Sequence, residues 1–552
     1  MKRLVLLALP CLLLFACTSK QTVDLIVSNA VVYTVDSAFT VAQALAIRDG
    51  KIVTAGSNDY ILGRYHANQL YDLQGKAVYP GFIDAHCHFL RYGLGLQYAD
   101  LTGTRSFAEV VERLVAHRKK YPVAAWIVGR GWDQNDWPVK QFPDRDTLDR
   151  LFPDTPVLLG RVDGHAALAN GKALQLAGVT AQSKTSGGVV EVKNGRPTGM
   201  LVDNAIDLVY KAVPAASREE IVTGLKQAER NCLAVGLTTV DDAGLSYGEV
   251  GILDSLYRAN QLFIRAYVML EPSAENRDYY FKNGPYKTDQ LNVRSFKVYA
   301  DGALGSHGAC LLADYHDQRG NRGFLLSSPE ELRKLAGAIY EHGFQMNTHC
   351  IGDSANRLLL EYYGQVLEGK NDRRWRIEHA QVVSAPDVAR FSEFSVIPSV
   401  QPTHATSDMY WAGDRLGPDR VKTAYAYKNL LQQNGMLALG SDFPVEDINP
   451  LYGFHAAVAR QDAKGYPAGG FQVENALSRE EALRGMTTWA AYGNFEEKEK
   501  GSIESGKLAD FVVLDADIMK APAANLWSVK VLQTFIGGKE VYNRSGVRLA
   551  AK

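Results

Sequence analysis

Two histidines, His86 and His88, follow an apolar stretch of the chain, and their spacing could hold a transition metal. The stretch from Val78 to Ile83 is apolar and typical of a β-strand. Because alternate residues of a strand share one face, both imidazoles would point to one place while Cys87 faces away. Two histidine nitrogens at a strand end are typical ligands of zinc and related ions. One such pair is more often structural, so the metal hypothesis depends on further ligands.

Four further residues that could hold a metal stand at the ends of other apolar, strand-like segments. They are Lys297, His349, His379 and Asp442. Each of them alone is more often structural than catalytic, but six candidates at strand ends make a far more specific pattern. Their nitrogen and oxygen atoms suit one or two divalent ions. Zinc is the expected metal, with manganese, cobalt or iron as alternatives.

The elements that must position these residues are eight apolar strand candidates separated by helical stretches. The strands end near His88, Asp241, Leu270, Asp301, His349, His379, Gln401 and Asp442. Helical stretches such as 330–342 and 354–367 are long enough to cross back over a parallel sheet. Eight strand–helix units predict an α/β fold, a TIM-type (β/α)8 barrel, whose chemistry gathers at the C-terminal strand ends.

The first barrel unit is much longer than the others. About 150 residues separate His88 from Asp241, roughly a hundred more than an ordinary strand–helix unit requires. We therefore expect a large insertion after strand 1, over about 100–230. Because it is attached at the catalytic face, it is expected to cover the site as a lid and to influence substrate choice.

Both ends of the mature chain are rich in short β-like runs separated by turn residues. These segments, 17–79 and 500–552, are each too small to bury a core alone. We expect them to combine into one small β-sandwich domain beside the hydrolase barrel of residues 80–499.

The first residues are predicted to be a signal peptide, 1–16. A basic start from Met1 to Arg3 precedes an apolar run, Leu4 to Phe15, that is too short for a transmembrane helix. The letters Leu-Phe-Ala-Cys that end at Cys17 resemble a bacterial lipobox, which implies lipid attachment to Cys17. This predicts an exported, membrane-anchored lipoprotein of the outer membrane or the periplasmic face. An ordinary signal with a chance cysteine is the alternative.

Composition favours a large globular protein without a polyanionic partner. The 552 residues are 46% hydrophobic, and 60 Lys and Arg balance 61 Asp and Glu. This balance gives no overall field that would favour nucleic acid or an anionic membrane surface. The expected partner is a small molecule, and membrane contact is expected only through the lipid anchor. The sequence does not determine the oligomeric state.

Together, the strand-end residues and the closing segment 501–514 resemble the metal-dependent amidohydrolase superfamily. Within it they resemble the amidohydrolase-3 group, which includes YtcJ-like enzymes and N-substituted formamide deformylases. The resemblance implies a set of metal ligands: His86 and His88 from strand 1, His349 and His379 from strands 5 and 6, and Asp442 from strand 8.

The resemblance also implies that Lys297 is a carboxylysine that bridges two ions and takes part in catalysis. An ammonium is a poor neighbour for two metals, whereas a lysine carbamate is an anionic, bidentate bridge. Its formation requires the neutral amine, which burial and nearby cations favour. An ordinary ion pair between Lys297 and a carboxylate such as Asp301 is the alternative.

The activity expected from this site is hydrolysis of a C–N bond other than a peptide bond, in an amide, a formamide or a cyclic amide. A metal would activate water and polarise the carbonyl. Asp442 would act as general base and then as general acid toward the departing nitrogen. Two alternatives remain: a lipid-anchored binding protein without catalysis, and a metal-dependent lyase or isomerase on the same barrel.

Four residues are weaker candidates for substrate contact: Trp132, His165, His307 and His404. Trp132 lies in a loop-like, aromatic segment, but structural packing explains it at least as well. His165 lies in a segment that resembles the family, with a capping or core role as the alternative. His307 stands where relatives often carry arginine, which argues against an acidic substrate, and His404 follows strand 7.

Overall fold

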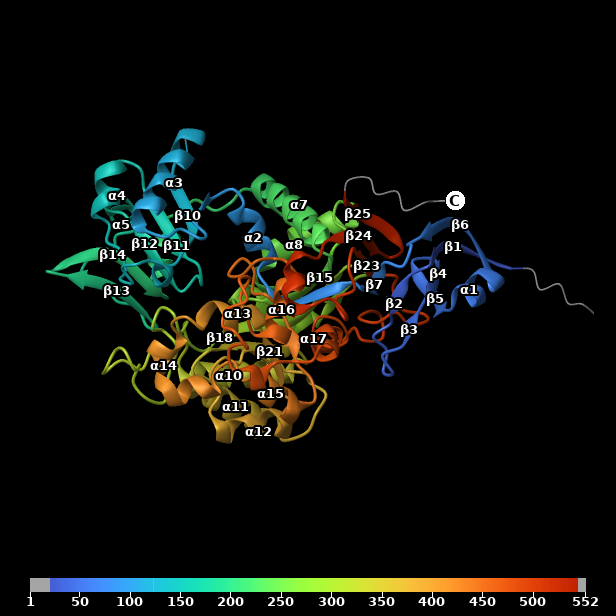
Figure 1. Ribbon diagram of the computed structural model, residues 1–552. Helices are drawn as coiled ribbons and strands as arrows, with labels where there is room; N and C mark the ends of the chain where they lie inside the picture. The colour runs from blue at the N-terminus through green and yellow to red at the C-terminus, as the bar shows by residue number, and fades with distance from the viewer. Residues whose placement is uncertain (1–19, 123, 545–552) are drawn as a thin grey trace, which may run out of the picture.

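The computed structural model describes residues 20–122 and 124–544, with an α/β barrel at its centre (Figure 1). All eight predicted strands are present and run parallel. In chain order they are β8 (Phe82–Cys87), β15 (Leu237–Leu245), β16 (Arg265–Leu270), β18 (Leu291–Tyr299), β19 (Gln345–Cys350), β20 (Arg376–His379), β21 (Ile397–Val400) and β22 (Ala438–Leu439). The predicted TIM-type barrel is therefore confirmed.

The barrel closes between its first and last strands, next to the proposed ligands. The amide of Asp442 donates to the carbonyl of His86 at 2.7 Å, and the amide of His88 donates to the carbonyl of Phe443 at 2.8 Å. The segment that follows β22 thus continues the pairing that its short strand begins. This closure fixes the position of Asp442 along the barrel axis relative to His86 and His88.

Helices surround the strands and cover the apolar side of the sheet. They include α2 (Phe89–Gly95), α7 (Arg218–Ala234), α8 (Tyr247–Arg258), α9 (Ala274–Asn283), α10 (Pro329–Glu341), α11 (Asp353–Leu367), α12 (Ala385–Glu393), α13 (Pro402–Asp408), α14 (Ala412–Arg420), α15 (Tyr427–Asn434), α16 (Pro450–Ala459), α17 (Arg479–Gly485) and α18 (Thr488–Gly493). Several begin with a capping box in which a serine and a glutamate three residues later satisfy free amides, as Ser328 and Glu331 do at α10. Apolar strand residues such as Phe296 and Ile377 belong to the core under these helices.

The segment between β8 and β15 forms a separate sheet with its own apolar core, which includes Leu114 and Leu159. Its strands, in spatial order, are β13 (Gly188–Lys193), β14 (Arg196–Asp203), β12 (Ala166–Ala169), β11 (Val157–Arg161), β10 (Ile127–Trp132) and β9 (Ala99–Asp100). Its helices are α3 (Phe107–Lys120), α4 (Asp146–Leu151), α5 (Gly171–Leu176) and α6 (Ile206–Tyr210). In Figure 1 this insert lies on the left of the barrel, with the β13–β14 hairpin pointing outward.

Two arginines connect the insert to loops at the C-terminal end of the barrel. The Arg130 guanidinium donates to the carbonyl of Pro444 at 2.6 Å and to that of Val162 at 2.8 Å. Arg415 of α14 donates to Asn135 Oδ1 at 3.0 Å. The bond from Arg130 to Pro444 and the bond from Arg415 to Asn135 hold the insert against the loops that follow β22 and β21.

Two further sheets lie on the right of Figure 1 and contain strands from both ends of the chain. The first has the order β5 (Lys51–Gly56), β4 (Ala44–Arg48), β1 (Gln21–Ser28), β6 (Tyr65–Asp72), with α1 (Asn58–Arg64) beside it. The second has the order β25 (Lys539–Asn543), β24 (Val531–Ile536), β23 (Phe511–Leu514), β7 (Ala77–Pro80), β2 (Val31–Tyr33), β3 (Val41–Ala42). One core cluster joins both sheets and includes Leu25, Ile47 and Phe511.

The expected signal peptide and Cys17 lie outside the described residues. In the part of the chain that the structure describes, none of the helices has the length and apolar character needed to cross a bilayer.

The lower part of the barrel interior is held by a buried ion pair. Arg376 on β20 donates to Asp241 on β15 at 2.9 Å and to the carbonyl of Ala85 on β8 at 3.1 Å, and all of these groups are buried. The pair therefore ties three strands together across the barrel below the histidines.

Arg376→Ala should destabilise the barrel by about 3–5 kcal/mol, because it leaves Asp241 buried without its partner charge. The matched control is Arg258→Ala, which removes an exposed partner of Asp254 and should cost less than about 1 kcal/mol. Urea unfolding followed by tryptophan fluorescence measures both variants. Equal midpoints for the two would show that the buried pair does not stabilise the barrel.

Candidate metal centre

The proposed ligands from four strands meet at the C-terminal end of the barrel, as the sequence suggested. His86, His349, His379 and Asp442 are each at most 7% exposed. The imidazole centroids of His86 and His379 are 5.0 Å apart, and those of His349 and His379 are 4.5 Å apart. Four short strand ends therefore place four imidazoles and one carboxylate around a single buried space.

Each of the four histidines has one ring nitrogen near a protein oxygen, which directs the other nitrogen elsewhere. The pairs are His86 Nδ1 with Glu378 Oε2 at 2.6 Å, His88 Nδ1 with the Ala243 carbonyl at 3.0 Å, His379 Nδ1 with Gln401 Oε1 at 2.7 Å, and His349 Nε2 with the Gly302 carbonyl at 3.4 Å. Since these oxygens accept, the nitrogens beside them carry the proton. When such a ring is neutral, its second nitrogen carries a lone pair, as metal-binding histidines require.

The lone pairs of His86 and His88 both face the Asp442 carboxylate, and the amine of Lys297 also lies near that of His86. His88 Nε2 lies 3.3 Å and His86 Nε2 lies 3.6 Å from Asp442 Oδ1. Within the described residues, Asp442 Oδ1 is buried and has no hydrogen-bond partner. Three acceptors so close together are favourable around a cation, and this donor set fits a divalent metal. His86, His88 and Asp442 form one group of suitable ligand atoms, and His379, His404 and Asp442 form a second.

The ionisation of these side chains agrees with metal binding. Burial lowers the pKa of His88 and holds the pKa of His349 and His379 well below the usual value, so these rings are neutral at neutral pH. Burial opposes ionisation of Asp442, but the neighbouring histidines, His88 first, outweigh it and hold its pKa well below the usual range. Neutral imidazoles and an ionised carboxylate are the protonation states that a divalent cation requires.

Lys297 on β18 points into the same space. Its Nζ lies 2.9 Å from His86 Nε2, and the side chain is 1% exposed. Burial lowers its pKa to about 8. Asp301 accepts instead from the backbone amides of Ile351 at 3.0 Å and of Gly352 at 2.8 Å. Among the described residues Lys297 forms no ion pair with Asp301, so that alternative receives no support.

Residues that the sequence analysis did not select hold the ligands in place. Asp84 accepts from the Ser441 hydroxyl at 2.6 Å, from the Ser441 amide at 3.0 Å and from the His86 amide at 3.2 Å. It thereby links the two ligand strands β8 and β22. A Cβ atom at position 440 would lie 2.5 Å from the backbone nitrogen of His86. Only glycine therefore allows the two backbones to lie this close. In the sequence, the one feature that indicates this role of Asp84 is its spacing: it lies two residues before His86 and so shares a strand face with it.

A cavity of about 740 Å³ opens above the ligands and is closed on one side by the insert. His165 lines it and is half-buried, with its Nδ1 2.6 Å from Oδ1 of the buried Asp203. Burial opposes protonation of His165, but the hydrogen bond and charge of Asp203 outweigh it and raise its pKa. The His165 ring lies 5.0 Å from that of His349, centroid to centroid. The insert therefore brings one of the four substrate-contact candidates next to the candidate metal ligands.

The other three candidates have different surroundings. Trp132 is 1% exposed, donates through Nε1 to the Leu159 carbonyl at 2.9 Å and packs in the core of the insert, away from the cavity. His307 lies 3.2 Å from Asp317 and also does not line the cavity. His404 lines the cavity, with Nε2 3.9 Å from Asp442 Oδ2.

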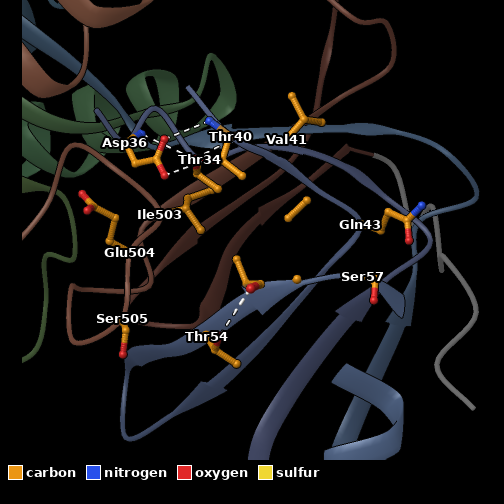
Figure 2. A pocket seen from close by; sticks show the side chains of 13 residues that line it. Thr34, Asp36, Thr40, Val41, Gln43, Thr54, Ser57, Ile503, Glu504 and Ser505 are labelled. Carbon is orange, nitrogen blue, oxygen red and sulfur yellow. Dashed lines mark hydrogen bonds between the residues drawn. The ribbon is translucent and has the colours of Figure 1, made fainter. Parts of the chain in front are cut away.

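A second hollow, of about 510 Å³, lies in the small β region and is drawn in Figure 2. Asp36 at its edge accepts from the Thr40 amide at 2.8 Å and from the Thr40 hydroxyl at 2.9 Å, so its carboxylate fixes its own turn. None of the groups of potential metal ligands found among the described residues lies there. Both groups of potential metal ligands in the described part of the chain lie at the barrel cavity.

Comparison with known proteins agrees with this geometry. A family model described as "Amidohydrolase family" matches residues 69–542. The chain is 34% identical over 542 residues to Protein LONG AFTER FAR-RED 3 of Arabidopsis thaliana, across 94% of this chain and 91% of that protein. It is 27% identical over 552 residues to N-substituted formamide deformylase of Arthrobacter pascens, across 95% and 99% of the two chains.

Among solved structures, an uncharacterized metal-dependent hydrolase from Pyrococcus horikoshii superposes with a TM-score of 0.73 and 28% identity. The match covers 90% of this chain and 99% of that one. The similarity therefore extends over nearly the whole chain and is not confined to the barrel.

Proposed function

The chain belongs to the amidohydrolase family, and we propose that it hydrolyses a C–N bond in a non-peptide amide, a formamide or a cyclic amide. The observation that carries the proposal is the set of histidine lone pairs around the unpartnered Asp442 Oδ1. This arrangement suits a divalent metal, and a metal beside a buried carboxylate suits hydrolysis. The relative named N-substituted formamide deformylase supports the choice of bond.

His86, His88, His349, His379 and Asp442 would hold the metal, with zinc the expected ion and one or two ions per chain. When bound, it would supply activated water and polarise the scissile carbonyl. Asp442 would take the proton from the attacking water and deliver it to the departing nitrogen. Glu378 and Gln401 would keep the rings of His86 and His379 in the tautomer that points a lone pair inward.

We also propose that Lys297 is carboxylated in the active protein. Its amine is buried, lies 2.9 Å from His86 Nε2 and has a pKa lowered to about 8 by burial, which favours the neutral amine that reacts with carbon dioxide. The reaction forms an N–C bond, releases one proton and produces an anion next to the metal ligands.

The cavity supports a substrate larger than a simple formyl group. Its volume of about 740 Å³ is in the range of sites for drug-sized molecules. Apolar side chains such as Leu304 and Trp411 line it together with the carboxylates of Asp408 and Glu446. Burial raises the pKa of Asp408 to about 7 and also raises that of Glu446. Arg91, Arg130 and Arg161 line the same cavity, so its walls carry ionisable groups of both signs.

Turnover in water labelled with ¹⁸O tests the reaction type. We expect purified protein supplied with zinc to cleave members of a panel of N-acyl, N-formyl and cyclic amides, and to place one labelled oxygen in the acid product. Protein stripped of metal should lose this activity and regain it when zinc is returned. Unlabelled products would indicate a lyase or isomerase, and metal-independent cleavage would contradict the mechanism.

A further inference from the structure

His404 is a buried histidine whose inward nitrogen has no protein partner. It lies in the first turn of α13 (Pro402–Asp408), directly after β21, and is 8% exposed. Within the described residues, its Nε2 is buried and makes no hydrogen bond. A buried nitrogen left without a partner costs about 1–3 kcal/mol, so a purely structural histidine would be expected to have one.

The carboxylates around His404 do not satisfy this nitrogen. Asp408 accepts from the Tyr425 hydroxyl at 2.7 Å, and Glu446 accepts from the Ser407 hydroxyl at 2.6 Å. The nearest carboxylate oxygen is Asp442 Oδ2, at 3.9 Å from His404 Nε2. That separation is too long for a hydrogen bond.

The same separation is close to what two ligands of one metal require. Ligand atoms at about 2.0–2.2 Å from a tetrahedral ion lie roughly 3.3–3.6 Å apart, so a small side-chain movement is enough. The His404 ring is stacked on that of His379, with centroids 5.9 Å apart and 19° between the planes. One ligand atom from each of His379, His404 and Asp442 lies within 4.8 Å of the others.

The two carboxylate oxygens of Asp442 face two different groups of histidines, and each group could hold a metal ion. Its Oδ1 faces His86 and His88, at 3.6 and 3.3 Å, whereas its Oδ2 faces His404. A carboxylate with its two oxygens directed in this way is able to bridge two cations. The position next to His404 is therefore distinct from the one next to the β8 histidines.

We propose that His404 is a direct ligand of a second divalent ion, which it holds together with His379 and the Oδ2 atom of Asp442. The proposal rests on the proposed metal centre and adds a ligand from strand 7 to those from strands 1, 5, 6 and 8. His349 lies beside this position as well, and its Nε2 faces the Gly302 carbonyl, which leaves its Nδ1 as the lone pair. The histidine after β21 thus adds one more ligand to the position beside His379 and Asp442.

Cobalt titration of the full protein, stripped of metal, tests this role without using activity. Wild-type protein should bind two Co²⁺ ions per chain, with separate affinities and separate visible absorption changes. In His404→Ala the weaker-held ion should lose at least about 100-fold in affinity, since removing even an outer partner of a ligand costs 10–100-fold. His404→Asp, which restores an oxygen ligand, should recover part of that affinity with an altered absorption band.

Two controls separate loss of a ligand from loss of structure. His307→Ala removes a histidine that does not line the cavity and should bind cobalt as wild-type protein does. Circular dichroism and thermal unfolding of the metal-free variants should match those of metal-free wild type. If His404→Ala misfolds, the His404→Asp spectrum still decides, because a direct ligand change must move the band.

Binding of two ions by folded His404→Ala with wild-type affinities and spectrum would overturn the proposal. So would a wild-type protein that binds one ion whose affinity and spectrum do not change in His404→Ala. Failure of wild-type protein to bind any metal would instead contradict the proposed function, so the two failures are distinguishable.

Discussion

Asp442→Asn should lower kcat by about a thousandfold or more. The substitution removes the proposed general base, a group that typically contributes 10²–10⁴-fold. It also replaces an anionic ligand by a neutral amide whose donors would point at the lone pairs of His86 and His88. Occupancy by zinc should fall as well, because both oxygens of Asp442 face candidate ligand nitrogens. Steady-state kinetics and metal content by mass spectrometry measure the two effects.

The matched control for this variant is Asp447→Asn, five residues along the same loop, where the side chain is exposed. It should keep turnover and metal content near those of wild type. Far-ultraviolet circular dichroism of Asp442→Asn should be unchanged, because the backbone amide that closes the barrel is retained. Turnover within tenfold of wild type at full metal content would exclude Asp442 as the base.

The barrel could be predicted because each of its strands carries a strong local signal. Apolar residues that face the helices, such as Val298 and Ile377, mark the strands, and the polar ligands mark where those strands end. The weakest case is β22, which has only two residues in regular pairing. It was still recognised because Asp442 follows an apolar run, although its closure with β8 depends on backbone bonds that no residue pattern shows.

The supporting residues were harder to predict because their role depends on contacts between distant segments. Glu378 looks like part of a Glu-His pair on one strand, yet its carboxylate reaches His86, 292 positions away. Asp84 looks like a strand-end aspartate, yet it holds Ser441, 357 positions away. Neither partner is encoded by local periodicity, so only the closed barrel identifies them.

The local sequence was also insufficient to decide which of the substrate-contact candidates line the cavity. An aromatic in a turn-rich segment fits a binding loop and a packed core equally well, and Trp132 belongs to the core of the insert because Leu159 accepts its indole proton. Composition did not distinguish His404 from a surface histidine. Its importance comes from the turn after β21, which directs Nε2 toward Asp442.

Lys297→Ala should lower turnover at least about 100-fold and reduce metal content. As proposed above, the carboxylated side chain would contribute an anion next to His86, and that charge offsets part of the repulsion between two cations. The variant loses this charge without removing any imidazole. Native mass measurement of wild-type protein should show the added mass of one carbon dioxide per chain, and this addition should be absent from Lys297→Ala.

Small molecules added to Lys297→Ala should distinguish a carbamate from a plain amine at this position. If Lys297 acts through a carboxylated side chain, a short carboxylic acid added to Lys297→Ala should enter the vacated space and return part of both metal content and turnover. A short alkylamine of similar length should not, because it supplies a cation where an anion is needed.

Lys297→Arg is the matched variant: it keeps the positive charge and length but does not form the carbamate, so it should be as inactive as Lys297→Ala. Rescue by the amine, or activity in Lys297→Arg, would show that a cation at this position suffices. The mechanism would then depend on Asp442 and the histidines without an anionic bridge.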